Sequence, residues 1–509
     1  MDRRDREHDR QGPSGRPAMT AVLSPESALA LALLTPFVGA SVLPLFHDRP
    51  NLREAVTLVT AASLCFIVLQ LLGPLQHGAR PEIDIIEIVP GLAVAFKVEP
   101  LGMLFGLVAS SLWFVNSIYS IGYMRGNDEP RQTTFYVCFA VAIGSAIGIA
   151  FAKNLFTLFL FYEALTLSTY PLVTHKRNEE AIRAGRTYLI FLLGTSLLLL
   201  LPAIIATWVF AGTLDFKPGG ILPASLGAAT IAALLALYVF GIGKAAVMPL
   251  HFWLPAAMVA PTPVSALLHA VAVVKAGVFS ILKVAVLVFG IDTLSSTGQA
   301  TWLTVVAGVT IILASVIALR QDNLKRRLAY STISQLSYIV LGVAVLAPIS
   351  VTGAAMHIAA HAFSKITLFF AAGSIYTAAH LTQVSQLDGI GRRMPWTMGA
   401  FTIGALGMIG VPPTAGFLGK WFILGGAMQT ANWLAVAVIF VSTLLNAGYF
   451  LPIVYRAFFC DSVDDGHDKH SGEAPWPIVV ALTVTAAGTV LMFFLPDVPF
   501  SLAKLISGR

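Results

Sequence analysis

Charged side chains are scarce in this sequence, and its basic residues do not gather in a nucleic-acid-binding patch. Only 11% of the 509 residues are charged, whereas 57% are hydrophobic and the mean hydropathy is +0.80. The isoelectric point near 9.2 results from Lys and Arg in short loops between apolar runs, so it indicates no nucleic-acid partner. Those runs are roughly 20 residues long, the length that spans a lipid bilayer. We therefore expect a polytopic membrane protein.

Cysteine is also scarce. Cys65, Cys138 and Cys460 are widely separated and offer neither a disulfide framework nor a metal cluster. The sequence contains no CxxC pair, no GxGxxG after a strand and no haem-attachment motif. We therefore expect no bound metal or cofactor, and any redox chemistry would belong to partner subunits.

Apolar segments recur along the whole chain and predict an all-α polytopic membrane protein with about 14 transmembrane helices. The segments are approximately 27–46, 54–73, 98–120, 133–151, 154–173, 187–210, 225–258, 262–290, 301–319, 328–347, 350–378, 395–427, 432–458 and 475–496. Several are longer than one crossing needs, which a break or a re-entrant bend would explain. Residues 81–100 alternate around a central Pro-Gly and predict a small extracellular β-hairpin.

The basic residues predict the orientation of the chain. Sixteen Lys and Arg fall in the loops of one side and six on the other, and positive charge favours the cytoplasmic side. Both termini are therefore expected on the periplasmic side of a bacterial cytoplasmic (inner) membrane. The first 26 residues have a composition typical of disorder, and a translation start at Met19 would remove most of them.

Five lysines and no arginine remain inside the apolar segments: Lys244, Lys275, Lys283, Lys365 and Lys420. Arginine keeps its proton, whereas a desolvated lysine can lose one near neutral pH. Because a charge at mid-bilayer costs at least ~2.5–3.5 kcal/mol, such residues are functional by default. Lys283 lies late in its segment, and we expect it to extend its ammonium to the membrane surface instead. The pattern favours proton exchange over a fixed positive charge.

Two long segments contain helix-breaking residues beside a lysine. Pro249 cannot donate a hydrogen bond to the preceding turn, so the seventh helix should break or kink one turn after Lys244. In the twelfth segment, two prolines and two glycines precede Lys420. The lysines are 176 positions apart (244 to 420), and paired interruptions indicate an inverted-repeat transporter. The halves are not equivalent, because the residue 176 positions after Glu163 is Ile339.

Glu163 is the only acidic residue deep within a predicted span, and we hypothesise that it pairs with Lys244. A nearby carboxylate stabilises the proton on a lysine and desolvation opposes it, so a change in their separation would load or release a proton. The alternative is a structural carboxyl paired with a neighbouring helix. In the eleventh segment, His357, His361 and Lys365 share one helical stripe. A zinc site needs more ligands, so a polar track for protons is the preferred interpretation.

Four stretches of the sequence resemble the antiporter-like membrane subunits of respiratory complex I and of the Mrp cation/proton antiporters. They are HFWLPAAMVAPTPVSALLHAVAVVKAG (251–277), RQDNLKRRLAYSTISQLSYIVLG (320–342), HIAAHAFSKITLFFAAGSI (357–375) and GVPPTAGFLGKWFI (410–423), within a likeness over residues 90–460. The resemblance implies two inverted five-helix repeats with broken helices 7 and 12, and a hydrated polar axis along the membrane plane. Matched to the family's motifs, the implied proton-carrying residues are Glu163, Lys244, Lys275, His269, His357, His361, Lys365 and Lys420.

Composition and resemblance together predict how the chain is divided. The expected parts are a disordered tail (1–26), helices 1–3 with the hairpin (27–132), two repeats (133–290 and 301–458) and a polar loop with a C-terminal helix (459–509). The expected partners are other membrane subunits of a multisubunit complex, the lipid bilayer, protons and, as a second transported ion, Na⁺.

Three functions fit these expectations. The leading hypothesis is a proton-translocating subunit of an Mrp-type Na⁺/proton antiporter, most similar to the D subunits of such systems because the chain ends without a long lateral helix. The first alternative is an antiporter-like subunit of a complex I-type NADH:quinone oxidoreductase or of a membrane-bound hydrogenase. The second is a membrane partner of an inorganic-carbon uptake complex. In each case the chain is a transporter subunit without redox chemistry of its own.

Overall fold

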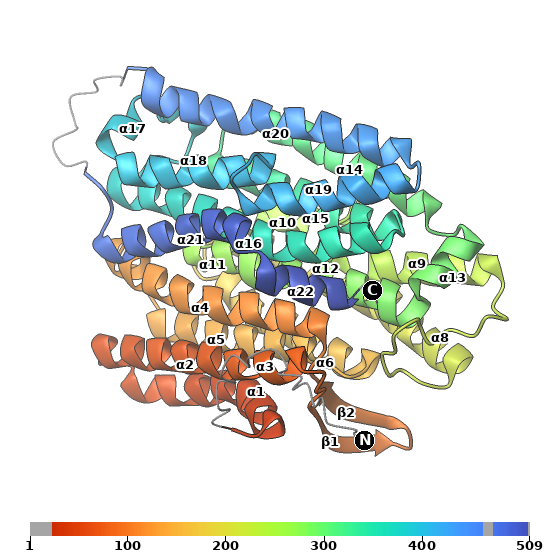
Figure 1. Cartoon of the computed structure of the whole chain (residues 1–509). Coiled ribbons are helices and arrows are strands. Elements are labelled where there is room, and N and C mark those ends of the chain that lie inside the picture. Colours follow the sequence, from red (N-terminus) through yellow and green to blue (C-terminus); the bar gives the residue numbers. More distant parts are fainter. Residues whose placement is uncertain (1–22, 462–471, 507–509) are drawn as a thin grey trace, which may run out of the picture.

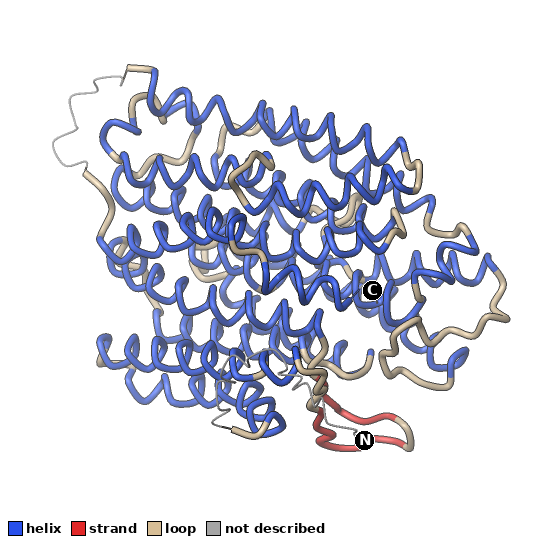
Figure 2. Tube along the Cα trace, in the orientation of Figure 1, coloured by secondary structure: helices blue, strands red, loops and turns tan. Residues whose placement is uncertain are grey.

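The computed structural model describes residues 23–461 and 472–506. Most of the predicted disordered tail (1–26) and the alternative start at Met19 therefore lie outside the described residues. The described chain is a bundle of helices that run side by side, with one small sheet (Figure 1, Figure 2). The chain thus has the all-α polytopic membrane fold that the sequence predicts.

Most helices follow one another through short connections. Before residue 228 they are α1 (Pro25–Val42), α2 (Pro50–Gln70), α3 (Leu72–Gln76), α4 (Pro100–Gly126), α5 (Gln132–Ala150), α6 (Leu155–Val173), α7 (Glu179–Thr195) and α8 (Leu201–Ala211). The middle of the chain forms α9 (Ala228–Gly241), α10 (Trp253–Ala256), α11 (Thr262–Ala266), α12 (Val273–Val284) and α13 (Ile291–Thr297). The remainder forms α14 (Thr301–Arg320), α15 (Leu324–Ala344), α16 (Pro348–Ala379), α17 (Ile390–Arg393), α18 (Pro395–Ile409), α19 (Ala415–Gln429), α20 (Trp433–Phe459), α21 (Trp476–Phe494) and α22 (Asp497–Ile506). The hairpin separates α3 from α4, and a longer loop separates α8 from α9.

Local sequence determines where many of these helices begin. The side chains of Asn154, Asn178, Asn323 and Asn432 each accept a hydrogen bond from the backbone N–H three residues later, at 2.8–3.1 Å. Such a cap satisfies one of the donors that a helix N-terminus leaves free. Other helices, including α1, α2, α4, α16 and α18, begin with proline, whose missing N–H costs nothing at that position.

Eleven helical stretches of the described residues are long and apolar enough to cross a membrane. The other three predicted segments coincide with α9 and α10, with α15, and with α18 and α19. Two of these are interrupted, and α15 carries many Ser, Thr and Gln side chains. Their crossing of the membrane stays a prediction.

The predicted β-hairpin is present. Strands β1 (Glu82–Val89) and β2 (Leu92–Lys97) pair antiparallel, with Glu82 opposite Lys97 and Val89 opposite Leu92. The turn between them is Pro90-Gly91, and Gly91 adopts φ +82°, a conformation that favours glycine. In Figure 1 the hairpin, α13 and the C-terminal end of α22 lie at one end of the bundle and α17 lies at the other. The end of the bundle that carries the β-hairpin is called the hairpin end below.

Both predicted helix interruptions are present, but the first begins earlier than expected. Helix α9 ends at Gly241, before Lys244, which lies in a short 3₁₀ turn (Gly243–Ala245). The prediction of a break one turn after Lys244 was therefore wrong in position: the chain leaves the helix at Ile242 (ψ +59°), ahead of Lys244 and Pro249, and Ala246 then adopts a left-handed conformation (φ +54°). The second interruption follows α18 at Gly410 (φ +88°), and Lys420 lies in the following helix, α19.

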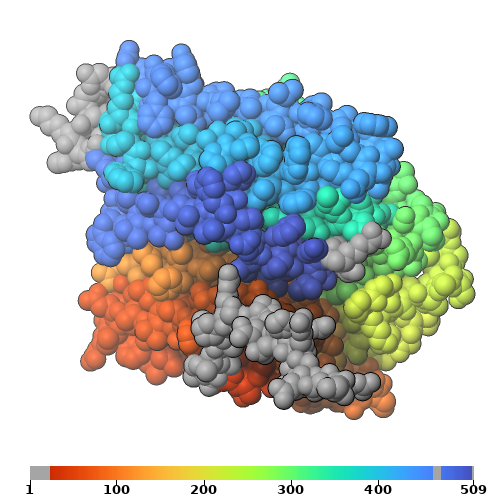
Figure 3. All heavy atoms as spheres, in the orientation of Figure 1, coloured from red at the N-terminus to blue at the C-terminus, as the bar shows by residue number. Residues whose placement is uncertain are grey.

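The centre of the bundle consists of α16 and the irregular stretch from α11 to Phe289. Every residue in the most apolar part of that stretch is buried, as are nearly all in α16. Two π-helical turns, Leu267–Val271 and Ala285–Phe289, flank α12, and such turns frequently mark functional sites. In the face shown in Figure 3, the blue atoms of α19 to α22 close over this interior. Side chains on α12 and α16 are thus shielded from the surroundings.

Candidate functional site

Lys244 is fully buried and held by α6. Its Nζ donates to the backbone carbonyl of Tyr162 at 2.8 Å and to Thr166 Oγ1 at 2.5 Å. The same ammonium lies 3.2 Å from the centroid of the Tyr162 ring, a cation–π contact that substitutes for part of the lost hydration. One turn of one helix therefore supplies the contacts of the lysine head group.

The backbone of the first break is satisfied by side chains rather than by helix hydrogen bonds. The Lys244 N–H donates to the Tyr162 hydroxyl at 3.1 Å, and Trp253 Nε1 donates to the Gly243 carbonyl at 3.1 Å. A broken membrane helix needs such partners, because lipid offers none. Gly277 of α12 packs directly on this break: a Cβ there would collide with the backbone of Lys244 and Ala245. The break is therefore stabilised by specific hydrogen bonds and by the close packing of α12 on its backbone.

Glu163 lies beside the Lys244 site without touching it. Both of its carboxylate oxygens are buried and make no hydrogen bond within the described residues. It follows Tyr162 on α6, and it interacts electrostatically with Lys244 and with the phenol of Tyr188. The two predicted partners are therefore neighbours in the structure, separated by more than the reach of a direct ion pair.

Lys275 and His361 form a direct contact across the middle of the bundle. The Lys275 ammonium on α12 is hydrogen-bonded to Nδ1 of His361 on α16, and both side chains are buried. A protonated lysine bonded to an imidazole nitrogen can pass its proton to the ring, which is then able to pass a proton from its other nitrogen. His361 Nε2 has no hydrogen-bond partner within the described residues.

A line of buried polar side chains continues from these residues to Lys420, joined by hydrogen bonds except between the two histidine rings. The rings of His361 and His357 stack with centroids 6.1 Å apart, and His357 Nε2 lies 3.0 Å from Gln335 Oε1 on α15. Gln335 Nε2 donates to the Met408 carbonyl at 3.2 Å, and Lys420 Nζ donates to the same carbonyl at 2.8 Å. This line connects α12, α16, α15 and the second interruption.

Lys365 and His269 are buried but lie outside that line of polar side chains. Lys365 Nζ donates to the Ser331 hydroxyl and lies 3.4 Å from the Leu328 carbonyl, both on α15. Neither ring nitrogen of His269 has a hydrogen-bond partner in the described part of the chain, and its ring lies 4.8 Å from that of Phe369. Both residues interact electrostatically with His361. His269, Lys275, His357, His361 and Lys365 thus lie on α16 or against it, whereas Glu163 and Lys244 lie at α6.

The expectation that Lys283 reaches the membrane surface was wrong. Its side chain is fully buried, and Nζ forms an ion pair with Glu99 Oε2 at 3.1 Å and donates to the Ala152 carbonyl at 2.7 Å. Glu99 precedes α4 and is 184 positions away in the sequence (99 to 283), so no local pattern indicated the pair. A buried ammonium keeps its charge at low cost only when a partner of this kind is present.

Sequence reasoning missed several side chains that position the lysines. Tyr162 and Thr166 hold Lys244, Gln335 connects His357 to the second interruption, and the Tyr338 ring lies 4.7 Å from Lys420 Nζ. One signal was available: Tyr338 follows Tyr162 by the same 176 positions that separate the two lysines. A comparison of the sequence with itself at that offset would have found both tyrosines.

The loops at the end opposite the hairpin contain ionisable groups with shifted pKa values. Burial and the nearby Arg131 lower the pKa of His175, after α6, to about 4, and its Nε2 lies 3.6 Å from Glu129. In the second half, the bidentate contact from Arg456, at 2.7 and 2.9 Å, lowers the pKa of the Asp388 carboxyl. The first group loses its charge on folding and the second keeps it.

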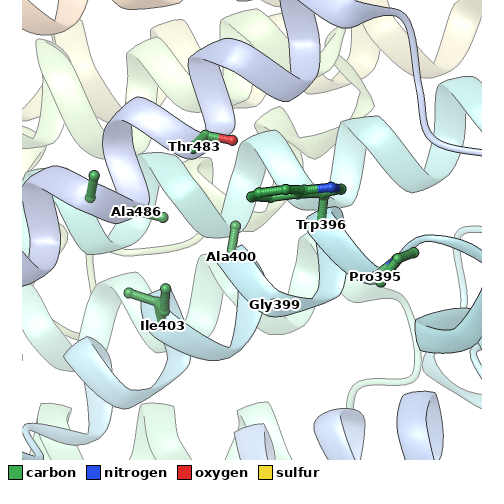
Figure 4. A pocket seen from close by; sticks show the side chains of 8 residues that line it. Pro395, Trp396, Gly399, Ala400, Ile403, Thr483 and Ala486 are labelled. Atoms are coloured by element: carbon green, nitrogen blue, oxygen red, sulfur yellow. The ribbon is translucent and has the colours of Figure 1, made fainter.

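A hollow on the side of the bundle lies away from all of these residues. It has a volume of about 440 Å³ between α18 and α21 and is lined by Trp396, Ala400, Ile403, Thr483 and Ala486, among others (Figure 4). Its lining is almost entirely apolar and contains no ionisable side chain. It belongs to the apolar exterior of the helices rather than to the candidate site.

Known proteins resemble the chain in both sequence and fold. Residues 152–446 match the family described as "NADH:quinone oxidoreductase/Mrp antiporter, TM". The chain is 32% identical to NADH-quinone oxidoreductase subunit N of Desulforudis audaxviator over 79% of its own length and 82% of that protein. It is 29% identical to a probable K(+)/H(+) antiporter subunit of Rhizobium meliloti, over 88% of this chain and 46% of that longer protein.

A solved structure shares the fold over nearly its full length. A chain of the Mrp complex from Dietzia sp. superimposes with a TM-score of 0.85, covering 96% of this chain and 97% of that one. The two are 21% identical in sequence, so this likeness concerns the fold.

Proposed function

Because the chain belongs to the NADH:quinone oxidoreductase/Mrp antiporter family, we propose that it carries protons along its buried lysine and histidine residues within a multisubunit Mrp-type Na⁺/proton antiporter. The chain is an antiporter-like membrane subunit, and its homologues are subunits of membrane complexes. Our proposal adds the transported proton, the residues that carry it and the cation that is exchanged for it.

The single observation that supports this proposal most strongly is the line of buried polar side chains from Lys275 to Lys420. It passes through His361, His357 and Gln335, all of them buried in the interior of a membrane bundle. Lysine and imidazole exchange protons near neutral pH, whereas a purely structural network needs no titratable groups. Intramembrane residues of this kind commonly form proton relays.

Two gaps remain in the first half of the path, one between Glu163 and Lys244 and one between Lys244 and Lys275. Proton transfer can be gated at these gaps. Among the described residues, Glu163 has no hydrogen-bond partner, and Lys244 makes no hydrogen bond to Lys275 although α12 packs on its backbone at Gly277. Bringing a carboxylate to about 4 Å from an ammonium is worth ~4 kcal/mol at an effective dielectric constant of 20. Approach of Glu163 would therefore hold the proton on Lys244, and withdrawal would release it toward α12.

We assign the residues of the site to three roles. Glu163 is the switch. Lys244, Lys275, His361, His357 and Lys420 carry protons along the axis. His269 and Lys365 interact electrostatically with His361 and tune its proton affinity. We also propose that residues 133–290 and 301–458 are the inverted repeats, each supplying one interrupted helix. Both termini are proposed to lie on the periplasmic side, because basic residues concentrate in the opposite loops.

A redox-driven complex is the second candidate, and the 32% identity to an NADH-quinone oxidoreductase subunit favours it. The proton path would be the same, but electron transfer in partner subunits would supply the energy. The likeness to a K(+)/H(+) antiporter protein supports the leading candidate.

The deciding experiment uses inverted membrane vesicles that contain the native complex and a pH-sensitive dye. NaCl is added first, and NADH second. Proton movement on NaCl alone supports the antiporter, whereas movement only on NADH assigns the chain to a redox-driven pump. In either case, Glu163→Gln should abolish the signal while the complex still assembles, and the exposed Glu179→Gln serves as the matched control. Full transport by an assembled Glu163→Gln complex would refute the proposed proton path.

A further inference from the structure

A second buried ion pair lies apart from the axis described above. Lys283 Nζ is 3.1 Å from Glu99 Oε2, and the lysine side chain is fully buried while that of Glu99 is 13% exposed. The ammonium also donates to the Ala152 carbonyl at 2.7 Å and lies 4.3 Å from the centroid of the Phe216 ring. The lysine is thus fixed on its inner side, and the carboxylate is the only charged group bound to it among the described residues.

Glu99 lies in the wall of a polar cavity. The cavity has a volume of about 550 Å³ and is lined by Arg80, Lys97, Glu99, Phe216 and Asp292, together with apolar residues that include Leu505 and Ile506. These residues come from the hairpin, the loop before α9, α13 and α22, so the cavity opens at the hairpin end of the bundle (Figure 1). Lys283 is not part of its wall, and Glu99 stands between the lysine and the cavity.

The other ionisable groups around the cavity are held away from Lys283. Lys97 lies 3.4 Å from Glu82, and Arg80 donates to the carbonyls of Leu75 and Ala79. Asp292 is exposed on α13. Lys153, next to Ala152, pairs with Glu82 and Asp84 on the hairpin. Glu99 is therefore the one lining carboxylate that binds the buried lysine.

Lys283 shares a helix with Lys275 of the axis. The two are eight residues apart on α12, which corresponds to a rise of ~12 Å. Ser280, between them, is buried and its hydroxyl has no hydrogen-bond partner in the described ranges. Ser280 lies one helical turn before Lys283, on the same side of α12, and a hydroxyl can both accept and donate a proton, so together with water it can extend the path from Lys283 toward Lys275.

We propose that Glu99 and Lys283 form a proton-exchange port that connects Lys275 to the cavity at the hairpin end. This inference rests on the proposed function, since a port has a use only if the axis carries protons. The port adds Glu99 and Lys283 to the relay between the two interrupted helices, and it lets that relay exchange protons with the cavity beside α12.

The protons balance in each cycle. The Lys283 ammonium transfers a proton to the Glu99 carboxylate, which leaves a neutral amine and a neutral carboxylic acid. The acid releases that proton to water in the cavity and becomes a carboxylate again. The amine takes a new proton that arrives from Lys275 through Ser280 and water, and the ion pair is restored. One proton has moved from the axis to the cavity, and the reverse order moves one inward.

The test compares single and double variants in vesicles that contain the intact complex, driven by whichever of NaCl or NADH moves protons in the native form. We expect Glu99→Gln, Lys283→Met and the double variant each to lower proton transport at least tenfold. The exposed Asp497→Asn should stay close to the native rate. The double variant is decisive, because a purely structural ion pair can be replaced by two neutral side chains with little penalty.

The outcomes separate this inference from the function on which it rests. Native transport in the single variants, or recovery in the double variant, would overturn the port. Native transport by Glu163→Gln would overturn the proton axis itself, whatever the port variants do. If a port variant fails to assemble, the native complex is treated with dicyclohexylcarbodiimide, which modifies protonated carboxyl groups. Labelling of Glu99 with loss of transport supports the port, and absence of label at Glu99 overturns it.

Discussion

At both helix interruptions the lysine lies beside a tyrosine ring. The groups that balance the positive charge of the two lysines differ. Lys244 lies over the Tyr162 ring at 3.2 Å, and Lys420 lies by the Tyr338 ring at 4.7 Å, with both pairs related by the same sequence offset. Beside the first pair stands the carboxylate of Glu163, whereas the corresponding residue of the second pair is Ile339.

The second lysine is instead bound by the C-terminal end of the preceding helix, α18. Lys420 Nζ donates to the carbonyls of Met408 and Ile409, at 2.8 and 3.0 Å, which are the last residues of α18. The C-terminus of a helix carries a partial negative charge that stabilises a cation. A carboxylate can titrate or move, and backbone carbonyls cannot. This difference supports our proposal that the first half is the switch and the second a passive relay.

The largest loss of proton transport should come from removing the Glu163 carboxylate, which has no counterpart in the second half. Glu163→Gln leaves the volume unchanged but cannot exchange a proton, and we expect proton transport to fall ~10²-fold or more, as for loss of a general acid–base group. Dye quenching in vesicles with equal amounts of assembled complex measures this. A modest loss would mean that the carboxylate is structural and that the two halves are equivalent.

Replacing each lysine by arginine tests whether both halves exchange protons. Arginine keeps its charge and its proton, so Lys244→Arg should abolish transport even though the complex assembles. Lys420→Arg should also lower the rate of proton transport at least ~10-fold, since a residue that relays protons must release its own. The exposed Lys217→Arg is the control. Native rates for Lys420→Arg would show that the second half supplies only a fixed positive charge.

The tyrosines should differ in their effect on stability. The Tyr162 hydroxyl accepts the Lys244 N–H at 3.1 Å, so Tyr162→Phe leaves a buried donor unpaired, at a cost of about 1–3 kcal/mol. The Tyr338 hydroxyl donates to the Ile439 carbonyl at 3.5 Å, the long limit of such a bond, and Tyr338→Phe should cost less than about 1 kcal/mol. Thermal unfolding of the purified complex compares them, and equal losses would contradict the difference in backbone support.

The smallest expected effect is on the pH dependence of stability, through His175 in the loop after α6. The pKa of His175 is about 4 in the folded chain and the ordinary value is 6.5, so the unfolded chain binds more protons between these values. Stability should therefore fall as the pH drops from 6.5 toward 4. The melting temperature of His175→Gln should fall less than that of the native complex between pH 7 and 5.

Asp388→Asn provides the matched comparison from the second half. The pKa of Asp388 lies below its ordinary 3.8, so its ion pair stays charged across that pH interval. This variant should lower the melting temperature equally at pH 7 and pH 5. A pH-dependent loss in Asp388→Asn, or the native pH dependence in His175→Gln, would contradict the assignment.

The sequence predicted those features that depend on local chemistry. Apolar length predicted the helices, Pro-Gly the hairpin turn, and paired prolines the two interruptions. Lysines without arginine among the apolar segments predicted buried ammonium groups, and Lys244, Lys275, Lys365 and Lys420 are all buried.

Features that depend on contacts between distant segments could not be predicted. Lys283 shows this best, since its depth in the bundle depends on Glu99, a residue that directly precedes α4. The position of the first break also escaped prediction, because Tyr162 and Trp253 stabilise a chain that leaves the helix before its prolines. The sequence suggested Glu163 as the partner of Lys244 but gave no sign of the Tyr162 carbonyl and the Thr166 hydroxyl, which bind the ammonium directly.

The most direct test of the central claim is proton flux through the purified complex in liposomes under an imposed pH gradient and a sodium gradient, with native protein and Glu163→Gln compared at equal assembly. The account predicts sodium-dependent proton flux in the native complex and its loss in the variant. Equal flux in both would contradict a proton path controlled by Glu163 and Lys244.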